Sequence, residues 1–476
     1  MRTSAEYVDK LRKMKKNVYI DGQLVVRDGS ELLPSIRVLS KTFDLTEDAQ
    51  FKDAMTVTSH LTGATINRFT HINQNANDLL QKQRLTRKVC HLTGGCIQRC
   101  MGCDAINALS FVTFELDKAY GTEYARRLDK YLRYFQENDL TAAAAQTDVK
   151  GDRSLRPHEQ EDPDLYLHVV EQREDGIVVR GAKNHITMAA IADEIICLPT
   201  RAMKEAEADY ALAFAIPADS ENVKLVTHVA NPRPRKTFKA PVSDFGFADS
   251  FVVIDDLFVP WDRVFMCGEW PFAALLAHGF ALFHRHSYTG CKPALTDIVT
   301  GASALVAEYQ GIAKKQHVRS KLTHLAAVAE LVFSAGIAAA VEGQQHESGT
   351  YIPNTIYANV GRRHAGVNIY HEYEILTDLA GGLPATLPFE GDFVNPDTRK
   401  YLEKYIMRKK DVSPENVHLC FRLLSDMLCS SLSGVSANAG IHGGGSPIME
   451  EIVIAATYDF EEKKKIAKHL AGIKDS

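Results

Sequence analysis

Two short segments of the chain concentrate residues that could bind a metal or move protons. In the first, segment 91–104, three residues separate Cys96 from Cys100. If this segment is helical, the two thiols lie one turn apart on the same face and can share a metal. Free cysteines are also common in hydrophobic cores, so the pair alone leaves packing and metal binding equally open.

The second segment, 283–292, places two histidines, a tyrosine, a cysteine and a lysine within ten residues: His284, His286, Tyr288, Cys291 and Lys292. Such a density is typical of a functional site and unusual for packing alone. Three thiols and one histidine from the two segments would form a Cys₃His set. Chemistry alone favours zinc for such a set, although the spacing differs from the usual C-x₂-C of zinc sites.

A third cysteine creates a misleading motif in the first segment. Cys96, Cys100 and Cys103 have the C-x₃-C-x₂-C spacing of radical S-adenosylmethionine enzymes. In those enzymes the residue before the last cysteine is usually aromatic and the motif lies in a βα barrel. Here that residue is Gly102 and its surroundings look helical, so we interpret the match as incidental.

The rest of the chain must position these segments, and its 476 residues suit two or three domains or one large multilayer unit. From residue 1 to about 140 the pattern is mainly helical, after a capping box at Thr3 and Glu6 and a hairpin turn at 21–22. Residues 141–265 are strand-rich, with a hairpin at 174–176, and fit a small β-sandwich or barrel. Residues 266–476 are helical again, and the lack of βαβ alternation argues against Rossmann and TIM-barrel folds.

Composition limits the partners and the location. The net charge of −5 gives no reason to expect nucleic acid, because phosphate binding needs a basic surface. The sequence has no run of about 18 apolar residues, and its start lacks the apolar stretch of a signal peptide. We therefore expect no membrane partner and a cytoplasmic location. The nine cysteines are expected to be reduced thiols or metal ligands, not a disulfide framework.

The pair of motifs Cys96-x₃-Cys100 and His284-x₆-Cys291 resembles the split cluster motif of the 4-hydroxybutyryl-CoA dehydratase family. The resemblance covers essentially the whole chain, with further matching stretches at 65–69, 148–153, 174–183 and 442–447. The wider family includes flavin-dependent 4-hydroxyphenylacetate 3-hydroxylases, which lack the four ligands. The family implies an α+β fold of the acyl-CoA dehydrogenase-like type, with an N-terminal helical domain, a middle β domain and a C-terminal helical bundle.

The resemblance also implies the cofactors and the reaction. These are FAD, a [4Fe–4S] cluster ligated by Cys96, Cys100, His284 and Cys291, and the radical dehydration of 4-hydroxybutyryl-CoA to crotonyl-CoA. Related members also isomerise vinylacetyl-CoA. An acyl-CoA substrate, sensitivity to oxygen and a homotetramer are expected on the same ground.

Individual roles follow from the resemblance as well. His284 would also act as a base near C2, Tyr288 would hydrogen-bond the leaving hydroxyl, and Lys292 would stabilise the thioester enolate. The alternative is that Tyr288 is a core aromatic and Lys292 a surface cation. The flavin would be contacted by Asp148, Lys150, Asp152, Arg153, Ser154, Lys183, Thr187, His442, Gly443 and Gly444. The glycine loop is expected to open a helix, with Ser446 as N-cap and Pro447 at N1.

Two positions depart from the family pattern. Ala439 stands where the family has a glutamate, three residues before the histidine of the glycine loop, and Asp249 replaces a second glutamate. Aspartate can transfer a proton and alanine cannot. Glu450 or Glu451 could substitute for the missing group.

These departures leave three alternatives open. The chain could be a family member acting on a different acyl-CoA, a reduced-flavin-dependent aromatic monooxygenase, or a non-catalytic zinc-stabilised acyl-CoA-binding protein. The basic cluster 233–236 could meet CoA phosphates, but a solvated loop is the favoured interpretation.

Overall fold

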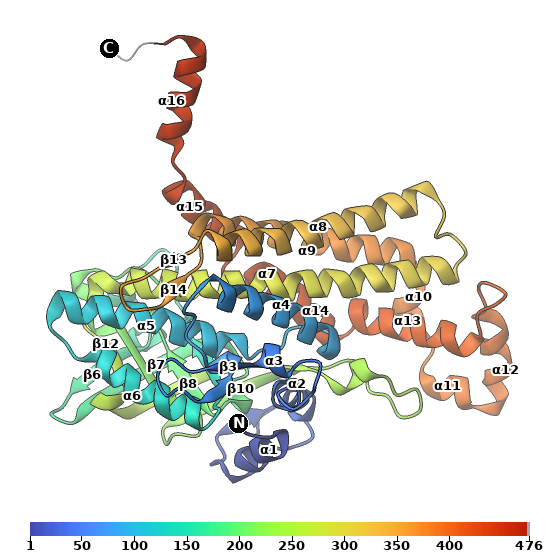
Figure 1. The fold of residues 1–476 in the computed structure, drawn as a ribbon. Coiled ribbons are helices and arrows are strands. Elements are labelled where there is room, and N and C mark those ends of the chain that lie inside the picture. The colour runs from blue at the N-terminus through green and yellow to red at the C-terminus, as the bar shows by residue number, and fades with distance from the viewer. Residues whose placement is uncertain (474–476) are drawn as a thin grey trace.

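The computed structural model describes residues 1–473 and shows a helical N-terminal region, two large β-sheets and a long helical C-terminal region (Figure 1), while β3 with β4 and β13 with β14 form two further two-stranded sheets. The expected capping box starts α1, and Asp21 and Gly22 take the positive φ angles of the predicted hairpin turn. The N-terminal elements are α1 (Ser4–Lys13), β1 (Val18–Ile20), β2 (Gln23–Val25), α2 (Leu33–Asp44), α3 (Lys52–Met55), β3 (Thr56–Thr58), β4 (Thr65–Asn67), α4 (Ala76–Thr93), α5 (Cys100–Tyr120) and α6 (Tyr124–Glu137).

The strand-rich region forms two sheets. The larger has the order β2-β1-β10-β11-β7-β6, so the N-terminal hairpin extends it, and the smaller has the order β12-β9-β8-β5. The hairpin expected at 174–176 joins β6 to β7, whereas β5 and β8 were not expected from the sequence. The strands are β5 (Ala142–Ala145), β6 (His168–Gln172), β7 (Gly176–Thr187), β8 (Glu194–Cys197), β9 (Leu212–Pro217), β10 (Val223–Ala230), β11 (Phe247–Pro260) and β12 (Val264–Cys267).

The C-terminal region is built on three long helices that run side by side (Figure 1). The first of them, α7, has 40 residues and includes the whole segment 283–292. The elements are α7 (Trp270–Tyr309), α8 (Gln316–Val341), β13 (Gln344–Gln345), β14 (Tyr351–Ile352), α9 (Thr355–Ala380), α10 (Leu383–Thr386), α11 (Glu390–Val394), α12 (Pro396–Tyr405), α13 (Pro414–Cys429), α14 (Ser431–His442), α15 (Pro447–Thr457) and α16 (Phe460–Ala471).

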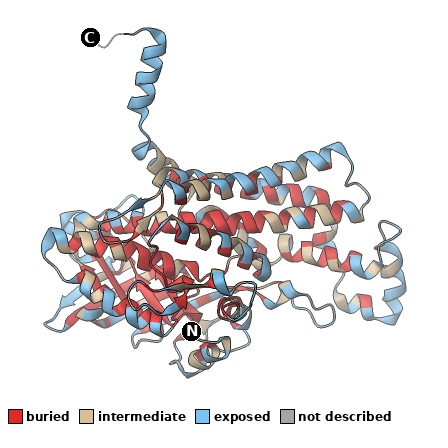
Figure 2. Cartoon of the chain, viewed as in Figure 1, coloured by how far each residue is buried: buried red, intermediate tan, exposed pale blue. Residues whose placement is uncertain are grey.

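The buried residues concentrate in the sheets and in the central part of the helical layer, whereas α16 is exposed along its length (Figure 2). One large core joins α1, α2, α5 and α6 to both sheets, and a second core lies within the C-terminal helices. A third and smaller core contains Cys90, Ile97, Cys100, Tyr288 and Cys291. The predicted site therefore lies where α4, α5 and α7 meet.

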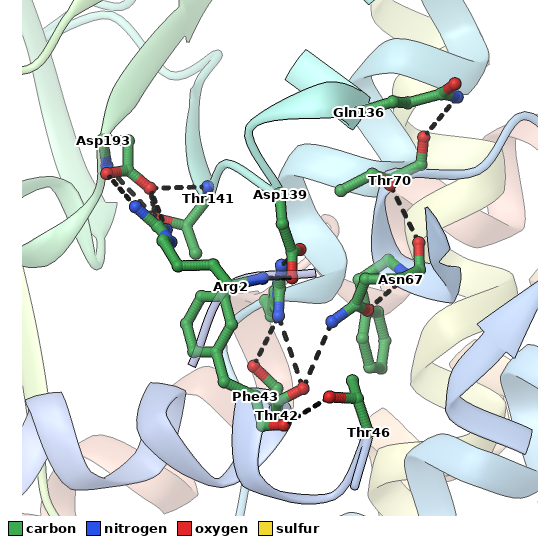
Figure 3. A network of polar contacts seen from close by, with 12 residues as sticks. Arg2, Thr42, Phe43, Thr46, Asn67, Thr70, Gln136, Asp139, Thr141 and Asp193 are labelled. Carbon is green, nitrogen blue, oxygen red and sulfur yellow. Dashed lines mark hydrogen bonds and ion pairs between the residues drawn. The ribbon is translucent and has the colours of Figure 1, made fainter. Parts of the chain in front are cut away.

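A buried polar network fixes the start of α5. Arg2 donates to both oxygens of Asp193, at 3.0 and 2.6 Å, and Asp193 also accepts from Thr141 at the head of β5 (Figure 3). Arg99, the residue before α5, forms a buried ion pair with Asp139. Because Asp139 also accepts from the backbone N–H of Arg2 at 3.3 Å, the cysteine segment, the N-terminal arm and β5 are held together.

One helix in the stretch 1–473, α8, is long and apolar enough to cross a membrane by length and composition. Its most apolar window is 39% buried in the protein, and the helix packs against α7 and α9. A core helix meets the same criterion, so this finding by itself does not indicate a membrane span.

The basic cluster 233–236 is only in part the solvated loop that we expected, since Pro234 and Lys236 are exposed but the Arg235 side chain is buried. The side chains of Arg235 and Asp426 form an ion pair that is 1% exposed on each side. Glu390 accepts from the backbone N–H groups of the next residues, including Phe238 at 3.1 Å. The segment is therefore attached to α11 and α13, and the Arg235 guanidinium is not available for CoA phosphates.

Candidate functional site

Three thiols converge between α4, α5 and α7. Cys100 is the first residue of α5 and Cys291 lies on α7, whereas Cys96 is in the loop before α5. The expected helical turn between Cys96 and Cys100 is wrong, because Gln98 has a φ of 64° and its N–H donates to Cys96 Sγ at 3.4 Å. Interaction with the thiols of Cys100 and Cys291 nevertheless holds the pKa of Cys96 well below its usual range.

His284 lies two turns before Cys291 on α7, next to Cys100. Its Nδ1 lies 2.9 Å from Asp104 Oδ2, and the ligand atoms of Cys100, Asp104 and His284 all lie within 4.8 Å of one another. A metal-binding histidine usually donates its second ring N–H to a carboxylate in this way. His286 points elsewhere: its Nε2 lies 3.2 Å from the carbonyl oxygen of Gly336, and burial lowers its pKa to about 3.

Tyr288 and Lys292 follow His284 at one-turn intervals on α7. The ring centroids of His284 and Tyr288 are 4.9 Å apart, and Lys292 Nζ lies 5.3 Å from the centre of the Tyr288 ring. Lys292 is only 8% exposed and burial lowers its pKa, so the alternative of a surface cation is wrong. The Tyr288 hydroxyl donates to the carbonyl oxygen of Ala439 at 3.4 Å.

The glycine loop lies directly on these side chains. A Cβ at Gly443 would overlap the Tyr288 hydroxyl, and a Cβ at Gly444 would lie 3.4 Å from His284 Cδ2. Arg362 donates to the carbonyl oxygen of Gly443 at 2.8 Å, and Arg285 donates to that of Gly444 at 2.9 Å. Two buried arginines thus hold the loop against the site.

The predicted helix entry after this loop is confirmed. α15 begins at Pro447 with Ser446 in the N-cap position, although the serine side chain makes no capping hydrogen bond. Gly444 and Gly445 have φ angles of 75° and 109°, which side chains other than glycine rarely adopt. The close approach to Tyr288 and the positive φ angles both explain why glycines occupy this loop.

Asp249 reaches the same place from the β region. It pairs with Thr187 across β7 and β11 and with His228 across β10 and β11. Burial raises the pKa of its carboxyl to about 6, and the negative charge of Cys96 acts in the same direction. Asp249, which the resemblance made an active-site acid, and Thr187, which it placed near the flavin, therefore interact with each other close to Cys96.

The residues expected to contact the flavin fall into two sets. Asp148 and Lys183 form a buried ion pair of 2.8 Å, and Lys183 also donates to the carbonyl oxygen of Leu198 at 2.9 Å. Asp152 accepts from both the N–H and the hydroxyl of Ser154. These contacts hold the loop that contains Asp148, Asp152 and Ser154 in its conformation.

The second set is cationic. The expected contacts Lys150 and Arg153 lie close together, and Arg201, which the sequence did not single out, lies near Lys150 as well. Burial is the main cause that lowers the pKa of Lys150, and the charges of the two arginines act in the same direction. His185 lies close to both Lys150 and His442 and so connects this group to the glycine loop. A group of cations next to a glycine loop is a suitable binding site for the pyrophosphate of a dinucleotide.

Several residues of the site were missed in the sequence. Asp104 could have been found, because it follows Cys100 by four residues and so lies on the same face of a helix. Arg285 could also have been found, because it lies in the segment 283–292. Lys82 and Arg362 carry no local signal, since only the packing of α4 and α9 against α7 brings them to the site. Glu450, on α15, is fully buried and lies 3.2 Å from the Arg285 guanidinium.

A helical region, a β region and a helical bundle with a thiol–histidine group between them define a protein of the acyl-CoA dehydrogenase-like class. The sequence matches the N-terminal region of 4-hydroxyphenylacetate 3-hydroxylase over residues 3–266 and the C-terminal region over residues 273–472. The chain belongs to this family. It is 39% identical over 490 residues to the 4-hydroxybutyryl-CoA dehydratase/vinylacetyl-CoA-Delta-isomerase of Clostridium aminobutyricum. The match covers 100% of both chains, so the two proteins belong to the same family.

Solved structures agree with the assignment. An oxygen-tolerant archaeal 4-hydroxybutyryl-CoA dehydratase from N. maritimus superimposes with a TM-score of 0.96 at 36% identity, covering 100% of this chain and 96% of that one. The oxygenase component of 4-hydroxyphenylacetate 3-monooxygenase, complexed with FAD and 4-hydroxyphenylacetate, gives a TM-score of 0.88 at 25% identity, covering 99% and 98%. The resemblance and the fold class expected from the sequence are therefore confirmed.

Proposed function

We propose that this enzyme is a lyase that dehydrates a 4-hydroxyacyl-CoA, with the conversion of 4-hydroxybutyryl-CoA to crotonyl-CoA as its reference reaction and vinylacetyl-CoA isomerisation as a related activity. Its cofactors would be FAD and a [4Fe–4S] cluster held by Cys96, Cys100, His284 and Cys291. The observation that carries the proposal is the convergence of three thiols and one carboxylate-bound histidine beside Tyr288. A flavin hydroxylase has no use for that group.

The reaction requires this combination of groups because the hydrogen at C3 of the substrate is not activated. When bound, the flavin would supply a one-electron oxidation and the return of the electron, and the cluster would supply a Lewis acid for the C4 hydroxyl. The chain must take the C2 proton, stabilise charge on the thioester oxygen and assist the departure of the hydroxyl.

The protein groups that we propose for these steps lie on α7 and β11. His284 is proposed as ligand and as base near C2, and Tyr288 as donor to the leaving hydroxyl. Lys292 lies one turn further along α7, and we propose that it stabilises the enolate. Asp249, with a pKa of about 6, has a proton affinity suited to transfer near neutral pH.

The site also departs from the family pattern, which favours a different acyl-CoA as the first alternative. The position of the expected glutamate is occupied by Ala439, whose carbonyl oxygen meets the Tyr288 hydroxyl. Glu450 pairs with Arg285 behind the glycine loop, so we propose that it supports the loop and does not replace the missing acid. A shorter carboxylate at Asp249 and a methyl group at Ala439 leave more room for the acyl chain.

Two other functions predict different cofactor contents. An aromatic monooxygenase using reduced flavin would contain FAD without iron, and a non-catalytic acyl-CoA-binding protein would contain zinc without flavin. We further propose the FAD contacts named above, a cytoplasmic location, a homotetramer, and the three-part division into residues 1–140, 141–265 and 266–476.

The test is purification without oxygen followed by counts of iron, sulfide, zinc and FAD per chain. About four irons and one FAD support the proposal, whereas FAD without iron or zinc without FAD contradicts it. Cys96→Ser and Cys291→Ser should lose iron, and Cys103→Ala is the matched control, because its Sγ points toward the carbonyl oxygen of His71. Since one relative is described as oxygen tolerant, the same counts after exposure to air decide whether the cluster is sensitive to oxygen.

A further inference from the structure

A network of buried side chains contacts Nδ1 of His284. Asp104 Oδ2 is 2.9 Å from His284 Nδ1. The other oxygen, Oδ1, accepts from Lys82 Nζ at 2.9 Å and from the hydroxyl of Ser287 at 2.9 Å. Lys82 is 1% exposed, and Asp104 and Ser287 are 0% exposed, so these contacts are shielded from bulk solvent.

The donors and acceptors of this network determine which ring nitrogen of His284 carries the proton. Lys82 can only donate, and the Ser287 hydroxyl donates here, so Asp104 Oδ1 serves entirely as an acceptor. An ionised carboxylate can only accept, which makes Nδ1 of His284 the protonated nitrogen of the neutral ring. The lone pair is then on Nε2, the nitrogen that has no hydrogen-bond partner within residues 1–473.

The charges explain why three helices, α4, α5 and α7, contribute side chains to the network. A carboxylate buried alone would be strongly destabilised, and Lys82 from α4 neutralises it. A buried ion pair gives little net stability compared with apolar side chains of the same size, so packing does not require it. The ion pair between Lys82 and Asp104 instead provides a hydrogen-bond acceptor, the Asp104 carboxylate, at a fixed distance from α7.

We propose that Asp104 is a positioning residue that fixes the tautomer and orientation of His284, so that Nε2 faces the three thiols, and that Lys82 and Ser287 hold Asp104 in place. This inference rests on the proposed function and extends it to residues that contact no cofactor. The competing interpretation is that Asp104 binds the metal directly, since its carboxylate lies near Cys100 and His284. Both of its oxygens already accept hydrogen bonds, which favours positioning.

The test uses the neutral double variant Asp104→Asn/Lys82→Met, because Asp104→Asn alone would leave a buried lysine unpaired. We expect turnover to fall ten- to hundredfold with KM changed less than twofold, the usual effect of removing an outer partner of a metal-bound histidine. Pulsed EPR of the reduced cluster in protein labelled with ¹⁵N-histidine should show an altered nitrogen coupling. Ser287→Ala, which removes one of two donors to Oδ1, should change turnover less than threefold. Cys103→Ala, beside Asp104 in sequence, should match the wild type.

The mechanism of the effect is tested in a His284→Cys background. If Asp104 acts through the imidazole, adding Asp104→Asn/Lys82→Met there causes no further loss of iron and no further change in the EPR spectrum. An equal loss of iron in both backgrounds overturns the inference in favour of direct ligation or a general structural role.

The inference and the proposed function can fail separately. If the wild type contains zinc and no iron, the proposed function is wrong, and the positioning role is then measured in the Co²⁺-substituted protein. There the double variant must alter the ligand-field spectrum while Cys103→Ala must not. An unchanged spectrum in the double variant overturns the positioning role at that metal as well.

Discussion

Asp249 lies directly opposite Thr187 in the β7–β11 pairing, and the two side chains interact beside the thiol of Cys96. Strand register therefore fixes the distance between a titratable carboxyl and a hydroxyl, while the loop before α5 brings the thiol to them. The β region and the helical region each supply part of one site. A substitution in either region should therefore alter the properties of the site residues in the other region.

The first prediction concerns proton transfer by Asp249. We expect Asp249→Asn to lower turnover by about 10²- to 10⁴-fold, because the amide cannot exchange a proton with the substrate. Asp249→Glu should retain activity, since the family has glutamate at this position. The measurement is turnover together with deuterium exchange at C2 of the acyl group. Asp255→Asn, an exposed position on the same strand, is the control.

The second prediction follows from the pKa of the same carboxyl, which burial raises to about 6 from an ordinary 3.8. A raised carboxyl pKa means that the folded protein favours the protonated form, so stability falls as the pH rises from 4 through 6. Asp249→Asn has no proton to lose. Relative to the wild type, its thermal midpoint should therefore rise between pH 4.5 and 7.5.

The rise in the pKa of Asp249 sets an upper limit on this change in stability. A change of about two pKa units corresponds to about 3 kcal/mol, and partial exposure of the side chain reduces this to on the order of 1–2 kcal/mol. The comparison is made by thermal melting of both proteins without cofactors. A difference in midpoint that stays constant with pH would show that Asp249 titrates normally in the folded protein.

The third prediction tests the fit of the glycine loop. A Cβ at Gly443 would overlap the Tyr288 hydroxyl, so Gly443→Ala must displace either the loop or the tyrosine. We expect turnover to fall at least tenfold and the thermal midpoint to drop by several degrees, as overpacking costs about 1–3 kcal/mol. Gly434→Ala in α14 is the matched control, because its Cβ meets nothing within 4 Å. That change should stabilise the helix slightly.

The parts of the site that sequence reasoning could find are those with local patterns. His284, Tyr288, Cys291 and Lys292 recur at helical spacing and do lie along one helix, α7. The order of helical, β and helical regions was also visible, because turn residues and periodicity are local properties. The hairpin at Asp21 is an example in which the turn residues alone were sufficient.

What could not be predicted depends on packing between distant segments. The helical turn between Cys96 and Cys100 was wrong because a positive φ at Gln98 has no sequence signature for a residue other than glycine or asparagine. Strand β5 was missed since four alanines favour a helix, and its pairing with β8 overrides that propensity. Lys82 lies 22 residues before Asp104, and only the packing of α4 against α5 and α7 reveals the ion pair.

The fourth prediction separates the hydroxyl of Tyr288 from its ring. Tyr288→Phe keeps the edge contact with His284 but removes the donor, so turnover should fall by about 10²- to 10⁴-fold. The thermal midpoint should change little, because the lost hydrogen bond to Ala439 is long, at 3.4 Å. Tyr131→Phe is the control: the Tyr131 hydroxyl is buried without a partner in the described structure, so activity should be unchanged. Equal losses in the two variants would refute a specific role for the Tyr288 hydroxyl.

The fifth prediction concerns assembly. α16 projects away from the rest of the chain (Figure 1) and exposes several large apolar side chains, of which Leu470 is 80% exposed and Ile466 is 50% exposed. An isolated helix of 12 residues is marginal in water, so α16 needs a surface to pack against. Apolar residues are also exposed on α8 and α9, among them Leu331 and Tyr370. We expect α16 to pack on another copy of the chain within the proposed tetramer.

Sedimentation velocity provides the measurement. The double variant Ile466→Asp/Leu470→Asp should shift the wild-type oligomer toward smaller species, because two charges would be buried in an apolar contact. Leu24→Asp on β2, at a position 48% exposed, should leave the oligomer intact. If the wild type sediments as a monomer, or if the α16 variant assembles normally, the apolar face of α16 has another role. Loss of FAD together with loss of the oligomer would further show that the flavin site depends on contact between subunits.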